Sequence, residues 1–317
     1  MASSIPEEKK SLIIVITGPT AVGKTEIAFK LAENLSSAEI VSCDSMAVYT
    51  EMNIGVSKPS PEMRKRIPHH LIDVCSVKDE FNVAEYVKLA KACIEDIIAR
   101  GKIPIIVGGS LLYLYSLLDG IFLGPGKDER LREELISAAK TRGLNYLYGK
   151  LKEIDPESAE KIHPNDLRRI IRALEVWLIT GEKISKLQRT RTGIYDKYNV
   201  KIFALIRERK KIYQDIDLRV ERMVSQGLID EVYRLWQKGL GLTAYQGHGY
   251  KEIIGHFEGR YSQEEAIRLI KRNTRRYAKR QISWLRRDKR IKWINLDNFK
   301  SGNEVVSYIM KESGIIS

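Results

Sequence analysis

Short apolar runs and amphipathic stretches alternate along this chain. Residues 12–16, 39–43, 102–107 and 200–206 are short runs that contain Val and Ile, as buried strands do. Amphipathic stretches at helical spacing lie between several of these runs. This order predicts an α/β fold whose core is a mostly parallel sheet.

The clearest helix is predicted between the second and third strands. Its apolar residues recur at helical spacing from Val83 to Ile98. Asn82 and Glu85 have the spacing of a capping box, and Gly101 is a typical helix end. We therefore expect a helix that packs on the sheet.

The pattern of residues 129–190 predicts helices and no strand, and the next β-type run begins at Val200. The chain therefore returns to the sheet after an interruption. We expect a P-loop α/β core formed by residues 1–120 and 200–317, and an all-helical insertion formed by residues 121–199.

The first predicted strand runs directly into a glycine-containing loop that opens the next helix. The loop is Gly18-Pro19-Thr20-Ala21-Val22-Gly23-Lys24-Thr25. This is the pattern of a phosphate-binding P-loop, in which glycines let backbone N–H groups turn inward. Lys24 supplies a charge for phosphate oxygens, and Thr25 offers a hydroxyl to Mg²⁺. The motif predicts a diphosphate or triphosphate ligand without naming the reaction.

Polar residues follow the second and third strands as well. Asp44 ends the second strand and Ser110 follows Gly108-Gly109 after the third. In open α/β sheets, ligands bind beyond the carboxyl ends of the strands, so both residues are expected beside the P-loop. Asp44 could hold magnesium, orient a water or accept a proton, or it could simply form an Asx turn.

The neighbouring His69 and His70 could be read as ligands of a metal ion. Adjacent residues on a strand point to opposite faces, so two such histidines rarely share one ion. We favour a structural role for the pair, which follows an irregular, proline-containing loop at residues 50–68.

The charge of the chain indicates an anionic partner. The formal net charge is +13, and residues 260–292 hold thirteen Lys or Arg against three Asp or Glu. A helical segment with Arg168, Arg169 and Arg172 adds a second basic surface. Such surfaces suit a nucleic-acid backbone, although a solvated helix face is the plainer alternative.

Cysteine content and hydropathy favour a cytoplasmic protein. The cysteines are Cys43, Cys75 and Cys93, odd in number and without metal-like spacing, which fits a reducing compartment. No stretch is long and apolar enough to cross a bilayer. From the residues alone, the reaction stays open between an ATPase, a small-molecule kinase and a diphosphate-dependent transferase.

Seven motifs, in order over about 280 residues, resemble those of the bacterial tRNA dimethylallyltransferases, also called tRNA isopentenyltransferases. They are GPTAVGKT, DSMAVY, PHHLID, VGGS, HPNDLRRIIRALE, GHGYKE and RRYAKRQISWLRR. The resemblance implies a P-loop core with a helical insertion. It also implies transfer of a dimethylallyl group from dimethylallyl diphosphate to the exocyclic amine of the adenosine just 3′ of the anticodon, position 37 of tRNA.

The resemblance assigns roles to four residues of the reaction centre. Lys24 and Arg219 would stabilise the leaving diphosphate together with Mg²⁺, and Thr20 would help to place the donor. Asp44 matches the general base that accepts a proton from the adenine amine. No phosphoryl group would move in this reaction.

Other motif positions are assigned by resemblance to the side that faces the anticodon stem-loop. They are Asp44, Ser45, Met46, Ala47, Ser110, Arg132, Arg168, Arg169, Ile170, Ile171, Arg172, Gln246, Gly247, His248, Gly249, Tyr250, Lys251, Lys279, Arg280, Gln281 and Arg286. The protein is expected to act as a monomer.

Two positions depart from the family pattern. Many members have Gln at position 47, where this chain has Ala47, and Thr at position 110, where it has Ser110.

Two other activities remain alternatives: an adenylate dimethylallyltransferase that acts on free nucleotides, and a nucleic-acid-binding NTPase or small-molecule kinase. The helical insertion and the basic segment favour tRNA over a free nucleotide.

Overall fold

The structure is a computed structural model that describes residues 10–122 and 124–316. The described residues divide into two compact units. The first unit runs up to Leu118 and resumes at Ile194, and the second is Asp119–Gly193.

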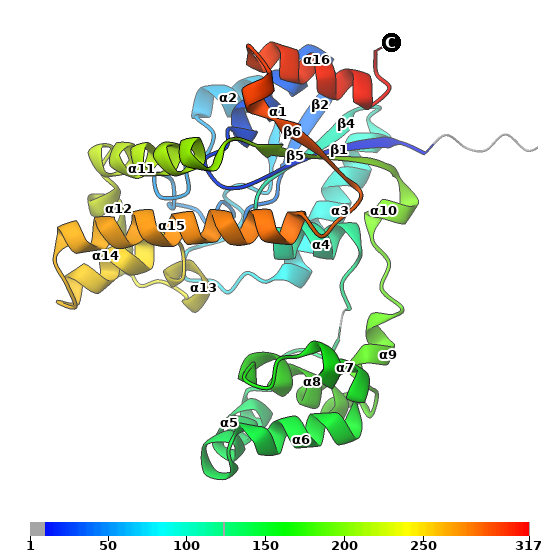
Figure 1. Cartoon of the computed structure of the whole chain (residues 1–317), viewed down its shortest axis with the longest axis vertical. Helices are drawn as coiled ribbons and strands as arrows, with labels where there is room; N and C mark the ends of the chain where they lie inside the picture. The colour runs from blue at the N-terminus through cyan, green and yellow to red at the C-terminus, as the bar shows by residue number, and fades with distance from the viewer. Residues whose placement is uncertain (1–9, 123, 317) are drawn as a thin grey trace, which may run out of the picture. The chain divides into compact units, whose positions relative to one another are not determined.

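A six-stranded sheet forms the centre of the first unit, in the order β3-β2-β4-β1-β5-β6 (Figure 1). The strands are β1 (Leu12–Thr17), β2 (Ala38–Ser42), β3 (His69–His70), β4 (Ile103–Val107), β5 (Asn199–Ile206) and β6 (Ile291–Asn295). All neighbouring strands pair in parallel. The parallel α/β fold expected from the sequence is therefore confirmed.

Helices cover the sheet and extend beyond it. They are α1 (Lys24–Leu35), α2 (Pro61–Arg66), α3 (Val83–Ala99), α4 (Leu111–Leu118), α10 (Ile194–Lys197), α11 (Arg209–Ser225), α12 (Leu228–Lys238), α13 (Leu242–Tyr245), α14 (Tyr250–Phe257), α15 (Gln263–Leu285) and α16 (Gly302–Glu312). The helices α1 and α16 share one core with Ile14, Ile16 and Ile105 of the sheet. The helices α11, α14 and α15 pack together beside the carboxyl ends of the strands.

The predicted capping box of α3 is present: Asn82 accepts from the Glu85 N–H, and the Glu85 side chain accepts from the Asn82 N–H. Other expectations were incomplete. The strand that holds the paired histidines is only two residues long, His69–His70, and the loop 50–68 contains α2. The edge strand β6 was not predicted, because it begins inside the strongly basic segment and only Ile294 is fully buried.

The second unit consists of helices in its described part, which omits residue 123. They are α5 (Glu129–Arg142), α6 (Leu144–Ile154), α7 (Pro156–Lys161), α8 (Leu167–Thr180) and α9 (Ile184–Gln188). Its core is formed by apolar side chains such as Leu147, Leu151 and Leu174. The expected boundary at residue 199 lies too late, because α10 packs on β5 and α4 of the first unit.

A buried carboxylate ties the helices of the second unit together. Glu175 of α8 is fully buried and accepts from Arg132 of α5 (Nε, 2.7 Å; Nη2, 2.9 Å) and from Arg172 (Nη1, 2.6 Å). It also accepts from the Asp128 N–H at 3.0 Å. Burial alone would raise the pKa of Glu175, but hydrogen bonds from Arg132 and Arg172 lower it to about 2.

We predict that Glu175→Ala destabilises the second unit by about 2–4 kcal/mol, because two partly buried arginines lose their counter-charge. In wild type, the contribution of Glu175 should be present near pH 7 and decline as the pH falls from about 4.5 toward about 2. Denaturant unfolding of both proteins across this range measures the effect. Glu134→Ala, which removes an exposed ion pair with Arg130, should change stability by less than about 0.5 kcal/mol.

Candidate active site

Three loops meet at the carboxyl edge of the sheet, after β1, β2 and β4. Their backbones lie so close that glycine is required at two points. A Cβ on Gly108 would lie 2.0 Å from the Cys43 carbonyl oxygen, and one on Gly18 would lie 2.5 Å from the carbonyl oxygen of Leu205. Gly18 also has a positive φ of 139°, which favours glycine. The Gly108 contact brings the second and third loops together, and the Gly18 contact places the P-loop against β5.

The first loop has the geometry of a phosphate cradle. Ala21 and Gly23 have positive φ values of 65° and 97°, so the chain turns sharply into the first turn of α1. Lys24 curls back over this loop, and its Nζ donates to the carbonyls of Gly18 (3.1 Å) and Pro19 (2.8 Å). The hydroxyl-bearing Thr25 is exposed beside it. The loop thus presents N–H groups, an ammonium and a hydroxyl to one space.

Arg219 of α11 connects the P-loop to the loop 53–58. Its Nη1 donates to Thr20 Oγ1 at 2.9 Å, its Nε to Ser57 Oγ at 3.1 Å, and its Nη2 to the Val56 carbonyl at 3.2 Å. The guanidinium therefore lies beside the phosphate cradle, although α11 is about 200 residues away in the sequence.

Asp44 forms an Asx turn and still has an unengaged oxygen. Its Oδ1 accepts from the N–H groups of Met46 (2.8 Å) and Ala47 (3.3 Å). Within the described residues, its Oδ2 makes no hydrogen bond. The turn predicted as an alternative is thus present, and it leaves one carboxylate oxygen available for chemistry.

Ser110 steadies the same turn from the third loop. Its Oγ accepts from the Ser45 N–H at 2.9 Å and donates to the Ser45 hydroxyl at 3.2 Å. A hydroxyl at position 110 is sufficient for both bonds, so the Thr-to-Ser departure preserves them.

Gln281 of α15 is a site residue whose role the sequence did not reveal. The resemblance assigned it to tRNA, but its side chain is 2% exposed. Its Oε1 accepts from the Thr20 N–H (2.9 Å) and its Nε2 donates to the Gly109 carbonyl (2.8 Å). Gln281 therefore joins the first and third loops. The available signal was its position between the buried Ala278 and Leu285 on one helix face.

Two cavities open on these groups. The larger, of about 830 Å³, is lined by Lys24, Thr25, Ala47 and the loop 53–58, among others. The smaller, of about 230 Å³, is lined by Ser45, Met46, Ser110, Gln246, Gly247, His248, Gly249, Tyr250 and Tyr277, among others. Both include Thr20, Asp44 and Arg219 in their linings. The carboxylate and the guanidinium thus face both spaces.

The two cations at this site are electrostatically coupled. Burial and the neighbouring Arg219 lower the pKa of Lys24 to about 7, and Asp44 acts in the opposite direction. Burial likewise lowers the pKa of Arg219. The free site therefore lacks sufficient negative charge for its cations, as expected of a site that receives an anion.

The segment Gln246–Lys251 is only partly accessible. Gln246 is exposed, and the half-buried His248 lies with its ring 4.8 Å from that of Tyr277. Burial lowers the pKa of His248, which favours the neutral form of its ring. Tyr250 is fully buried and donates its hydroxyl to Glu231, so its hydroxyl serves the structure.

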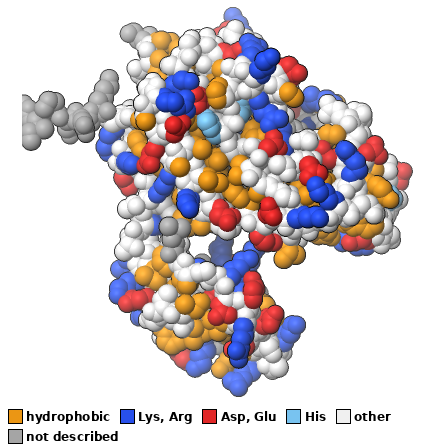
Figure 2. All heavy atoms as spheres, turned by 180° about the vertical axis from the view of Figure 1, so that it is seen from behind, with side chains coloured by type: hydrophobic (Ala, Val, Ile, Leu, Met, Phe, Trp, Pro, Cys, Tyr) orange, Lys and Arg blue, Asp and Glu red, His pale blue; other side chains and the backbone are white. Residues whose placement is uncertain are grey.

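Some basic side chains of α15 already have acidic partners. Lys271 pairs with Glu221 (2.7 Å) and Arg275 with Asp217 (2.5 Å). On the face drawn in Figure 2, Lys and Arg side chains are dispersed among acidic and apolar ones. The sequence-predicted Lys279, Arg280 and Arg286 are all exposed.

The second unit separates the remaining predicted residues into two groups. Arg168 and Arg169 are exposed on α8, whereas Arg132 and Arg172 are held by Glu175. Ile170 and Ile171 are 0% and 6% exposed and belong to the core of this unit. They lie inside the arginine motif, but the helix turns their side chains inward, so they are not tRNA-facing residues.

The paired histidines have separate partners. His70 Nε2 lies 2.7 Å from Glu39 Oε2, and His69 Nδ1 lies 2.7 Å from the Ile67 carbonyl. Over residues 10–122 and 124–316, no group of three or more His, Cys, Asp or Glu is arranged to hold a metal ion. Within the same residues, no helix is both long and apolar enough to span a membrane.

A P-loop, two cations and a carboxylate at the carboxyl edge of a parallel sheet define an α/β phosphate-binding protein. The IPP transferase family matches residues 47–288. The chain belongs to this family, that of the tRNA dimethylallyltransferases, and is a transferase.

Relatives in both sequence and structure cover nearly the whole chain. The tRNA dimethylallyltransferase of Alkaliphilus oremlandii is 46% identical, over 96% of this chain and 97% of its own. The tRNA isopentenylpyrophosphate transferase structure from Bacillus halodurans is 38% identical, with a TM-score of 0.70, and covers 96% of this chain and 97% of its own. A eukaryotic dimethylallyltransferase acting on tRNA is 27% identical, with a TM-score of 0.79, over 96% of this chain and 79% of its own.

We predict that the free protein binds inorganic diphosphate more weakly as the pH rises above about 7, the lowered pKa of Lys24. An anion prefers the ammonium form, so the Lys24-dependent part of the affinity should be steady below this pH and fall by up to about tenfold per unit above it. Titration calorimetry across pH 6–9 measures it. Lys24→Arg, whose charge persists, serves as the control for ionisation of diphosphate itself; equal pH slopes for both proteins would contradict the prediction.

Proposed function

We propose that this protein transfers the dimethylallyl group of dimethylallyl diphosphate to N6 of adenosine 37, just 3′ of the anticodon, in tRNA. One observation carries the proposal: Lys24 and Arg219 flank a P-loop beside the free Oδ2 of Asp44. Leaving-group stabilisation and proton acceptance are the two tasks that this reaction requires.

The donor is proposed to bind with its diphosphate on the P-loop. The loop N–H groups, Lys24 and Arg219 would neutralise the charge that develops on the leaving diphosphate. Thr20 holds the Arg219 guanidinium at 2.9 Å and so fixes the direction of its remaining donors.

The residues at the P-loop fit a magnesium ion. Thr25 offers an exposed hydroxyl oxygen, and the described residues hold no dedicated acidic cage. Mg²⁺ commonly binds in this way, through few protein oxygens, phosphate oxygens and water. When bound, the ion would supply additional charge neutralisation to the diphosphate.

Asp44 is proposed as the general base. The N6 lone pair forms the new bond to C1 of the allyl group while the C1–O bond breaks and its electrons go to the diphosphate. Asp44 Oδ2 accepts the proton that N6 loses. The Asx turn and the Ser110–Ser45 contacts hold this carboxylate in place.

The smaller cavity is proposed to receive the adenine, which must leave its stack. Its aromatic lining, His248 and Tyr277, suits a planar base, and Asp44 lies in the same lining. Ala47 is 4% exposed and bears no polar group, so any contact that Gln makes there in relatives must be replaced or lost. The exposed Lys279, Arg280 and Arg286 would contact the tRNA backbone.

We predict that labelled dimethylallyl diphosphate transfers to unmodified tRNA and to an anticodon stem-loop, but not to free AMP. Asp44→Asn should reduce the rate by about 10²–10⁴-fold, because the proton acceptor is lost. Asp79→Asn is a matched control, since Asp79 also accepts a local backbone N–H but lies outside both cavities.

Two outcomes would replace the proposal. Label in AMP alone would indicate a transferase that acts on free nucleotides. No label in any acceptor, together with consumption of ATP, would indicate an NTPase.

A further inference from the structure

The loop 53–58 forms part of the wall of the larger cavity and holds Arg219 in place. Two of the three hydrogen bonds made by the guanidinium go to this loop, to the Val56 carbonyl and the Ser57 hydroxyl. The loop contains no helix or strand, but two internal backbone hydrogen bonds close it into a turn, from the Ser57 N–H to the Ile54 carbonyl (3.0 Å) and from the Lys58 N–H to the Asn53 carbonyl (3.3 Å). Contacts from outside the turn set its place beside Arg219. The position of the guanidinium therefore depends on what fixes this loop.

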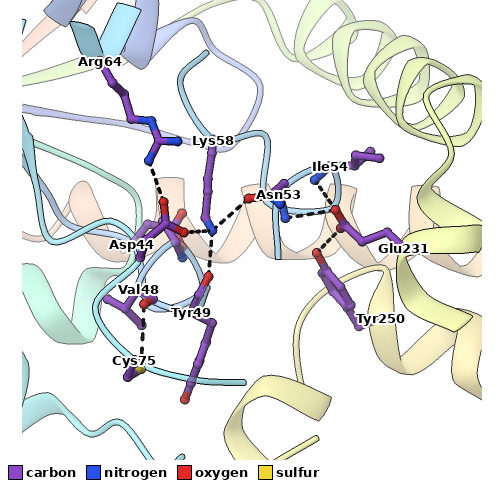
Figure 3. A network of polar contacts seen from close by, with 12 residues as sticks. Asp44, Val48, Tyr49, Asn53, Ile54, Lys58, Arg64, Cys75, Glu231 and Tyr250 are labelled. Atoms are coloured by element: carbon purple, nitrogen blue, oxygen red, sulfur yellow. Dashed lines mark hydrogen bonds and ion pairs between the residues drawn. The ribbon is translucent and has the colours of Figure 1, made fainter. Parts of the chain in front are cut away.

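A buried carboxylate fixes the first half of the loop (Figure 3). Glu231, in the first turn of α12, is 3% exposed. Its Oε2 accepts from the N–H groups of Asn53 (3.1 Å) and Ile54 (2.9 Å), and its Oε1 accepts from the Gly55 N–H (3.2 Å). Three consecutive backbone N–H groups thus converge on one side chain.

The hydroxyl of Tyr250 completes the set of donors, at 2.6 Å from Glu231 Oε1. The Tyr250 ring also packs directly on the loop, because a Cβ on Gly55 would lie 2.5 Å from it. Among the described residues, Glu231 has these four donors and no ion-pair partner. A buried charge held in this way is costly to leave unsatisfied, so it constrains the donors strongly.

The end of the loop is held by a buried cation. Lys58 has a side chain that is 4% exposed. Its Nζ donates to the Tyr49 carbonyl (2.7 Å), to Asn53 Oδ1 (3.1 Å) and to Asp73 Oδ1 (2.6 Å), and Figure 3 shows its contacts beside those of Glu231. Val56 and Ser57 therefore lie between two anchored points.

We propose that Glu231 is a positioning residue for Arg219: by fixing residues 53–55, it sets the place from which Val56 and Ser57 hold the guanidinium against the P-loop. Glu231 lines neither cavity, so it acts through the groups that it holds, which are the loop and the Tyr250 hydroxyl. The kinetic consequence of this inference rests on the proposed function, whereas the expected effect of Glu231 on anion binding does not.

We predict that Glu231→Gln lowers kcat/KM for dimethylallyl diphosphate by about 10- to 100-fold, because an amide has one accepting oxygen where the carboxylate has two. The KM for tRNA should stay within about twofold, a separation that general loss of structure would not produce. The affinity for inorganic diphosphate, measured by calorimetry, should fall together with the donor kcat/KM.

A double-mutant cycle tests whether Glu231 acts through Arg219. Arg219→Lys keeps a charge but lacks the planar guanidinium that reaches Thr20, Val56 and Ser57 together. In that background, Glu231→Gln should change diphosphate affinity by less than about threefold. Full additivity of the two effects would overturn the proposal, as would unchanged diphosphate affinity in the single variant.

Two further variants separate positioning from stability. Glu39→Gln changes another buried glutamate, held by Arg100 and Lys102 outside both cavities, and should lower the melting temperature without changing diphosphate affinity. Tyr250→Phe removes one donor to Glu231 and should produce a smaller loss of the same kind. If wild type binds diphosphate but transfers no prenyl group, the proposed function fails, and the cycle on binding still decides the role of Glu231.

Discussion

Close backbone packing at the carboxyl edge of the sheet is the constraint on which the site depends. Parallel pairing brings the ends of β1, β2 and β4 to the same edge, and there the chains approach to within a distance that excludes a side chain at Gly18 and Gly108. The P-loop, the Asp44 turn and the Ser110 loop therefore share one small region. A larger residue at Gly108 would separate the Asp44 turn from the Ser110 loop, and one at Gly18 would push the P-loop away from β5.

The packed loops are then joined by polar side chains that come from distant helices. Gln281 joins the P-loop to the third loop, and Arg219 joins the P-loop to the loop 53–58. Because these bonds involve buried or half-buried groups, each is expensive to break and defines the geometry closely. The same packing buries Lys24 beside Arg219. Burial and this second positive charge lower the pKa of Lys24, and the site therefore favours an anion.

The arginines of the second unit have two kinds of role, one in its core and one on its surface. Arg132 and Arg172 form ion pairs with the buried Glu175, and these contacts hold α5 and α8 together. Those that face outward, Arg168 and Arg169, stay accessible to a polyanion. Within the arginine motif of α8, Arg172 therefore has a structural position while Arg168 and Arg169 have surface positions, according to the helical face.

The sequence by itself determined the elements whose cause is local. The P-loop, the capping box of α3 and the placement of Asp44 at a strand end all follow from residue type and short spacing. The family resemblance added the roles of single residues, but it could not tell inward from outward positions.

Only the tertiary structure decided which side chains meet across long separations. Gln281 bonds a residue 261 positions away, and Glu231 bonds the loop 53–55 from 176 to 178 positions away. A polar residue on an amphipathic helix has the same local pattern whether it faces water or a buried backbone N–H. The choice between them depends on which element packs against that helix, and this is a property of the fold.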